Sequence, residues 1–138
     1  MLKLAALFVS LLASFAVRGE VVLVVSADSP VSTLTAGQVS NIYLGRIVQL
    51  PGQDAVIPID QRETTGLREK FYQEILGLNL SRVKAHWSKM LFTGRGRPPY
   101  QVSGDEEMKQ IVSANPVAIG YIDKENLDNS VKPVFLAD

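Results

Sequence analysis

The chain has 138 residues, a length that suits one compact domain and is too short for two well-formed lobes. Hydrophobic residues make up 46% and charged residues 20%, values typical of a folded globular protein and unlike those of a disordered chain. There is no cysteine and only one histidine, His86, which excludes disulfides, a thiolate nucleophile and a multi-histidine metal site. We therefore expect neither a metal centre nor any other cofactor.

The first residues have the pattern of a secretory signal peptide. Lys3 is followed by an apolar run from residue 4 to 17, which is shorter than the ~20 residues that a membrane span needs. We predict cleavage after Gly19, with Ala16 as the second choice. This leaves a periplasmic domain of residues 20–138 that has no stable membrane span. An uncleaved anchor or a buried N-terminal helix is the alternative, but the sequence directly after this segment already predicts a strand.

Removal of residues 1–19 takes away two basic residues and leaves 12 basic and 14 acidic ones, a net charge of −2. This balance argues against a globally basic, nucleic-acid-binding protein. The charge is unevenly distributed, because no acidic residue lies between Glu74 and Asp105. The basic residues of that interval are Arg82, Lys84, Lys89, Arg95 and Arg97.

The mature chain begins with a β-branched run over 20–26, which predicts a strand buried on both faces at the centre of a sheet. Thr35 then opens a helix, because Gln38 has the spacing of a reciprocal cap, and Gly45 ends that helix. A short strand over 55–60 follows.

A second helix is predicted over about 65–76 and ends at Gly77, and a third begins at Ser81 and buries Val83, Trp87, Met90 and Leu91. The glycines and prolines of 92–99 exclude helix and indicate an ordered functional loop.

The remaining elements are a helix capped by Ser103 with Glu106 and two strands, over 117–122 and 131–136. Strands that alternate with helices predict an α/β fold, in which a mixed or mostly parallel sheet has helices on both faces in three layers.

The turn from Asp60 to Arg68 is the first candidate binding site. A helix that begins at Thr64 or Thr65 would direct backbone N–H groups and the positive end of its dipole toward an anion. The two threonines add hydroxyl donors, and Gly66 lets a ligand approach the backbone. The alternative is that one threonine only caps the helix.

The second candidate is the loop that contains Arg95 and Arg97, whose guanidinium groups suit an oxyanion or a partner's carboxylate. A solvated basic surface is the alternative for both residues. We find no arrangement of a nucleophile, a base and an acid that would support catalysis, so we predict that the chain is not an enzyme.

Three segments occur in an order that resembles the phosphate-binding proteins of ABC transporters. They are 34–46, 61–71 and 117–122, within a resemblance that covers roughly 33–134. More closely, the chain looks like the small, single-lobe exported relatives of that family, in which a loop like 92–99 recurs. The resemblance implies a fold like one lobe of a type 2 periplasmic binding protein.

The resemblance also implies a ligand site. In full-length members an arginine, four residues before a Ser-Gly-Thr at a helix N-terminus, helps to hold phosphate between two lobes. The corresponding residues here are Gln61, Thr65, Gly66 and Leu67, so the arginine and the last threonine are replaced, and the opposite lobe is absent.

We therefore expect weak binding of phosphate or a related oxyanion, with an ABC transporter or another periplasmic protein as partner. The candidate ligand-binding residues are Gln61, Thr64, Thr65, Gly66, Leu67, Arg68, Arg95 and Arg97. A protein-interaction or sensor module is the alternative, with 93–99 as its contact surface. A phosphatase is the least supported reading.

Overall fold

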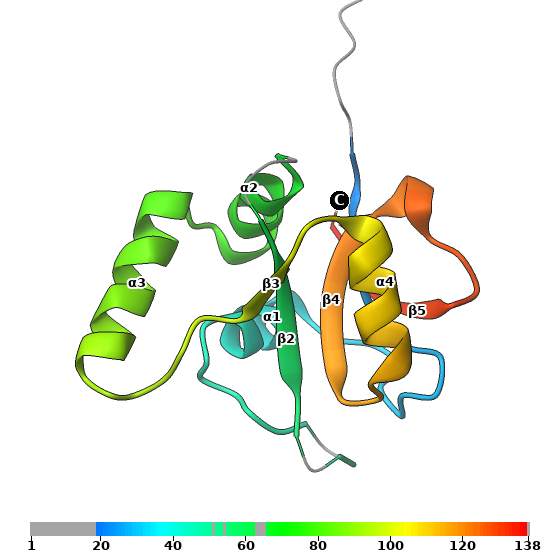
Figure 1. Ribbon diagram of the computed structural model, residues 1–138, viewed down its shortest axis with the longest axis horizontal. Coiled ribbons are helices and arrows are strands. Elements are labelled where there is room, and N and C mark those ends of the chain that lie inside the picture. The colour runs from blue at the N-terminus through cyan, green and yellow to red at the C-terminus, as the bar shows by residue number, and fades with distance from the viewer. Residues whose placement is uncertain (1–18, 51, 54, 63–65, 138) are drawn as a thin grey trace, which may run out of the picture.

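The computed structural model describes residues 19–50, 52, 53, 55–62 and 66–137. Its centre is a five-stranded mixed sheet with the strand order β3-β2-β4-β1-β5 (Figure 1). The strands are β1 (Val21–Ser26), β2 (Ile57–Gln61), β3 (Tyr100–Val102), β4 (Ala118–Asp123) and β5 (Val131–Leu136). Strand β2 runs parallel to β3 and β4, whereas β1 runs antiparallel to β4 and β5. The predicted α/β fold with a mixed sheet is confirmed.

Helices cover both faces of the sheet, which gives the three predicted layers (Figure 1). They are α1 (Ala36–Tyr43), α2 (Leu67–Phe71), the π-helix η2 (Tyr72–Leu76), α3 (Leu80–Phe92), α4 (Asp105–Ala114) and the 3₁₀-helix η3 (Lys124–Asn126). Alternate residues of β1 enter the two cores: Leu23 packs with α1, α2 and η2, and Val24 packs with α4. Strand β1 is buried throughout, as predicted, but β4 rather than β1 occupies the middle of the sheet.

Several helix ends follow from local sequence. Thr35 and Gln38 form the predicted capping box of α1, and the left-handed Gly77 (φ 67°) ends η2. The cap of α3 is Asn79 instead of Ser81, because its side chain accepts a hydrogen bond from the Arg82 N–H at 2.9 Å.

The predicted capping box of α4 is wrong. Ser103 donates from its N–H and its hydroxyl to Glu107 Oε2, at 2.8 and 2.6 Å, instead of pairing with Glu106. The N-cap position of α4 is Gly104, which has no side chain to accept a bond.

Helix α3 stands beyond the β3 edge of the sheet (Figure 1) and is held to the core through its middle. Trp87 is buried there and packs against Gly45. A Cβ atom on Gly45 would lie 3.0 Å from a carbon of the six-membered ring of Trp87. The neighbouring His86 ring lies 2.9 Å from the Leu44 carbonyl oxygen. Leu91 is 53% exposed, so its predicted burial is wrong, because the last turn of α3 passes beyond the core.

The predicted loop is confirmed as non-helical after Phe92, and the short strand β3 that follows it was not predicted. On the opposite face, α4 approaches β4 so closely that a Cβ on Gly120 would lie 2.3 Å from Met108 Sδ. Within the described part of the chain, none of the helices combines the length and apolar character that crossing a membrane requires.

Candidate functional site

A buried carboxylate, Asp60, lies under the turn that joins β2 to α2. It is 2% exposed and pairs with Arg68, whose Nε lies 3.2 Å from Asp60 Oδ2. The Tyr72 hydroxyl donates to the same oxygen at 2.7 Å, and the Tyr121 hydroxyl donates to Oδ1. We call these four residues the Asp60 cluster. They come from β2, α2, η2 and β4, so they tie both ends of the turn to the sheet.

The electrostatics of the Asp60 cluster keep its tyrosines neutral. Burial and then the Asp60 charge raise the pKa values of Tyr72 and Tyr121 well above the ordinary tyrosine value. Burial lowers the pKa of Arg68, but Asp60 together with Tyr72 and Tyr121 outweighs that effect, and the net shift is upward. Arg68 therefore stays charged beside Asp60, and the Tyr72 and Tyr121 hydroxyls keep the protons that they donate to this carboxylate.

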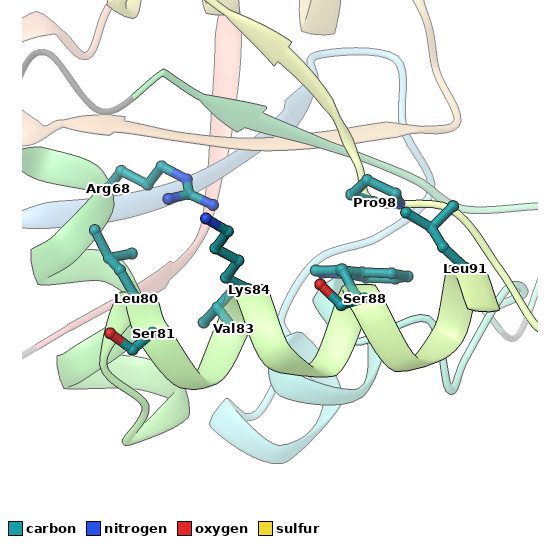
Figure 2. Close-up of a pocket in the computed structure, with 9 residues that line it drawn as sticks. Arg68, Leu80, Ser81, Val83, Lys84, Ser88, Leu91 and Pro98 are labelled. Atoms are coloured by element: carbon teal, nitrogen blue, oxygen red, sulfur yellow. The ribbon is translucent and has the colours of Figure 1, made fainter. Parts of the chain in front are cut away.

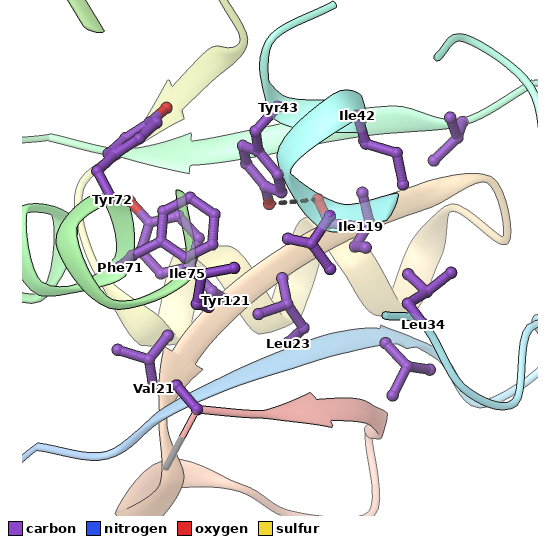
Figure 3. Packing of buried hydrophobic residues seen from close by; sticks show 14 of the residues in the cluster. Val21, Leu23, Leu34, Ile42, Tyr43, Phe71, Tyr72, Ile75, Ile119 and Tyr121 are labelled. Carbon is purple, nitrogen blue, oxygen red and sulfur yellow. Dashed lines mark hydrogen bonds between the residues drawn. The ribbon is translucent and has the colours of Figure 1, made fainter. Parts of the chain in front are cut away.

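Aromatic rings pack against the two tyrosines of the Asp60 cluster (Figure 3). Phe71 stacks on Tyr121 with ring centroids 4.0 Å apart, and Tyr43 meets Phe71 edge-on at 4.6 Å. The Tyr43 hydroxyl donates to the carbonyl oxygens of Ile59 and Ile119, at 2.9 and 3.3 Å. These contacts make the base of the β2–α2 turn a rigid platform.

Gln61, one of the predicted ligand-binding residues, lies inside the platform and is fully buried. Its Nε2 donates to Asp105 Oδ1 at 2.7 Å and to the Tyr121 carbonyl oxygen at 2.9 Å. Gln61 therefore links β2 to the start of α4 and β4 instead of presenting its amide to the solvent.

The other predicted residues of this turn are placed differently. Thr64 and Thr65 lie outside the described residues. Gly66 is exposed at the start of α2 in the left-handed conformation (φ 70°), which glycine adopts without strain. Leu67 is buried, and the Arg68 side chain points inward to Asp60.

A cavity of about 370 Å³ borders the start of α2 on the side of α4. Leu67 lines it together with three carboxylate residues, Asp105, Glu106 and Asp123. Asp105 Oδ2 accepts hydrogen bonds from the Asp123 N–H at 3.0 Å and from the Asn126 side chain at 2.7 Å. The field on this side of the turn is negative, which weakens the attraction for an anion.

Arg95 and Arg97 lie exposed in the loop between α3 and β3. Neither is among the described residues that line the cavity at Leu67 or the groove between Arg68 and α3. Pro98 is the loop residue that reaches that groove. The structure therefore does not bring the two loop arginines together with the α2 start in either cavity.

No group of three or more histidine, aspartate or glutamate side chains in the described ranges has the arrangement of a metal site. The sequence reasoning missed the Asp60 cluster. The available signal was an aspartate at the end of an otherwise apolar strand, with an arginine eight residues later. The neighbouring sequence could not predict the tyrosine partners of Asp60, since Tyr121 lies 61 residues away from it.

The fold is similar to solved structures of phosphate receptors. They include an ABC-type phosphate transport receptor from Vibrio cholerae (TM-score 0.67, 22% identity) and PstS from Borrelia burgdorferi (TM-score 0.64, 17% identity). A putative phosphate ABC transporter substrate-binding protein from Clostridium perfringens, solved with bound phosphate, matches with a TM-score of 0.66 and 28% identity.

Each match covers 84% of this chain but only 45%, 46% and 44% of the Vibrio, Borrelia and Clostridium chains, respectively. The chain thus spans less than half the length of these proteins. No protein-family model matches the sequence, and no curated protein matches it. The predicted resemblance to phosphate ABC transporter substrate-binding proteins is confirmed as a likeness of fold over 84% of this chain.

Proposed function

We propose that the chain is an exported, solute-binding-like domain that binds phosphate or a related oxyanion at the start of α2. Residues 1–19 are its signal peptide, and residues 20–138 act in the periplasm, in association with a phosphate ABC transporter. The observation that carries the proposal is the exposed, left-handed Gly66 at the start of α2, in a fold shared with a phosphate-bound relative.

The ligand is held by the backbone N–H groups at 65–67 and by the hydroxyls of Thr64 and Thr65. Short side chains and bare amides at a helix start suit an oxyanion, because the helix dipole adds to the hydrogen bonds. Gln61 and Arg68 act indirectly in this arrangement. Their side chains hold the turn in place through Asp105 and Asp60.

Binding is weak for two structural reasons. Asp60 already balances the Arg68 charge, and three carboxylates line the cavity beside Leu67. We expect a Kd of about 1 mM, which corresponds to about −4 kcal/mol. Arg95 and Arg97 contribute at long range through the local positive field, which salt screens.

Calorimetry with phosphate and sulfate at low salt tests the proposal. Glu106 has an exposed carboxylate in the cavity beside Leu67, so Glu106→Gln should strengthen binding about twofold, the effect of one charge at ~8 Å in water. Glu125→Gln, which removes an exposed carboxylate outside that cavity, is the matched control and should leave the affinity unchanged. Absence of heat at millimolar phosphate removes the proposal.

A second candidate function is that of a protein-interaction module. It is favoured by large apolar side chains exposed around the 93–99 loop, with Phe92 92% exposed and Tyr100 63% exposed. Light scattering and pull-down with Arg95→Ala and Arg97→Ala discriminate between the candidates. Unchanged association together with impaired anion binding rejects the interaction role.

A further inference from the structure

The last turn of α3 and the loop after it carry exposed apolar side chains. We call residues 89–100 the α3 tip, and none of them is buried. Leu91 is 53% exposed, Phe92 92% and Tyr100 63%. Figure 1 shows α3 at one end of the longest axis, with strands β2 and β3 between it and α4, whose first turn is acidic. The α3 tip therefore offers apolar surface to a partner outside the chain.

Three exposed cations accompany these apolar side chains, namely Lys89, Arg95 and Arg97. None of the three forms an ion pair or a side-chain hydrogen bond with a described residue. No acidic residue occurs in the sequence between Glu74 and Asp105. The α3 tip is thus locally positive, although the mature chain has a net charge of −2.

The backbone of the α3 tip is fixed by its own hydrogen bonds. The Gly94 N–H donates to the Leu91 carbonyl oxygen at 3.2 Å, and the Arg95 N–H donates to the Met90 carbonyl oxygen at 2.9 Å. Gly96 then packs against α3, because a Cβ on it would lie 3.4 Å from Met90 Cε. The cations and the apolar side chains are therefore presented on a preformed backbone, which reduces the entropy lost on binding.

The outer face of α3 continues the same combination. Arg82, Ala85, Lys89 and Phe92 follow one another at intervals of three or four residues, so they lie on one face of the helix, away from the buried Val83. All four are exposed, and this face has no acidic residue. Cations beside an exposed aromatic side chain are the combination that an anionic lipid surface attracts.

The groove between α3 and the rest of the domain shows where the α3 tip begins (Figure 2). The Lys84 side chain is directed toward Arg68, whereas Leu91 and Pro98 lie together at the other end of the groove (Figure 2). Pro98 is exposed, so it adds apolar surface beside Leu91. Lys84 is therefore not part of the α3 tip.

We infer that the α3 tip binds the surface of a bilayer that contains anionic lipids. Phe92 and Leu91 enter the interfacial layer, and the three cations contact the phosphates of the head groups. A bilayer accepts a protruding aromatic side chain at any point of its surface, whereas a protein partner must supply a matching pocket. The inference does not depend on the oxyanion site, because none of these residues lies at the start of α2.

Co-sedimentation of the mature protein with vesicles tests the inference. At about 50 mM salt, vesicles of equal parts phosphatidylglycerol and phosphatidylcholine should bind half of the protein at about 1 mM accessible lipid. Vesicles of phosphatidylcholine alone should bind it at least about thirtyfold more weakly, because each cation at an anionic surface contributes roughly fivefold. Inorganic phosphate at about 10 mM and constant ionic strength should not release the protein, since it cannot replace the apolar contacts.

Two variants with matched controls complete the experiment. Phe92→Ser should weaken binding to the anionic vesicles about tenfold, whereas Leu136→Ser, in an exposed leucine of β5, should leave it unchanged. Arg95→Gln should weaken it about fivefold. Lys124→Gln changes the net charge by the same amount at an exposed position of η3 and should change binding less than about twofold.

The inference is overturned by equal binding to both kinds of vesicle, unchanged binding in Phe92→Ser, equal losses in Arg95→Gln and Lys124→Gln, or release by phosphate. Absence of vesicle binding together with Phe92-dependent self-association in light scattering would also overturn it and would assign the α3 tip to a protein contact. A lack of phosphate binding at Gly66 would refute the proposed function but would leave the vesicle results standing.

Discussion

Replacement of Asp60 by asparagine tests whether the Asp60 cluster holds the β2–α2 turn. The substitution keeps the shape of the side chain but removes the charge that balances the buried Arg68. Removal of one partner of a buried ion pair costs about 3–5 kcal/mol. The hydrogen bonds from Tyr72 and Tyr121 would then reach a neutral amide and become weaker.

We therefore expect Asp60→Asn to lower the free energy of unfolding by about 3 kcal/mol, measured by urea denaturation. For a chain of this size that corresponds to a fall in Tm of roughly 10 °C. Glu20→Gln is the matched control. Its exposed pair with Lys124 contributes about 0–1 kcal/mol.

The double variant Asp60→Asn/Arg68→Met separates the ion pair from the general cost of each substitution. Because the second change removes the Arg68 charge that has lost its Asp60 partner, the combined loss should be smaller than the sum of the single losses by about 1–3 kcal/mol. A loss below about 1 kcal/mol in Asp60→Asn, or strict additivity in the double variant, would show that the ion pair does not hold the turn.

Three further measurements test the packing, the tyrosines and the exposed loop. Gly120→Ala should destabilise by about 1–3 kcal/mol in urea, because its Cβ would meet Met108, whereas Gly104→Ala, with open space around it, should be nearly neutral. The raised pKa values of the buried tyrosines favour the protonated form in the fold, so stability should be full below pH ~10 and fall above it, with the tyrosinate absorbance of the buried rings appearing only on unfolding. Constant stability from pH 9 to 12 would contradict this. The tyrosines concerned are Tyr43, Tyr72 and Tyr121. Phe92→Ser should leave urea stability unchanged but weaken any self-association seen by light scattering, since Phe92 is 92% exposed.

The features that the sequence predicts correctly are those determined within a few residues. Thr35 and Gln38 cap α1 because both bonds join residues three apart, and Gly77 ends η2 through its own left-handed backbone. The continuous apolar run of β1 predicts burial on both faces for the same local reason. The layered α/β fold follows from these elements and their order.

The features that the sequence did not predict depend on contacts between distant segments. The role of Gln61 depends on Asp105, 44 residues away, and the Asp60 carboxylate meets its tyrosines only when η2 and β4 pack together. Leu91 has the helical spacing of a core residue, but α3 extends past the core, so the periodicity predicts a burial that no partner supplies. Periodicity specifies one face of a helix and does not specify what covers it.

Oxyanion binding by the backbone at the start of α2 can be followed residue by residue. Inorganic phosphate is titrated into the ¹⁵N-labelled mature protein at low salt, and the amide resonances of Gly66 and Leu67 are recorded. We predict saturable shifts at both residues in the millimolar range, which diminish as salt is added, with the Trp87 indole resonance unchanged. Amide resonances of Gly66 and Leu67 that stay in place up to about 10 mM phosphate would contradict the claim.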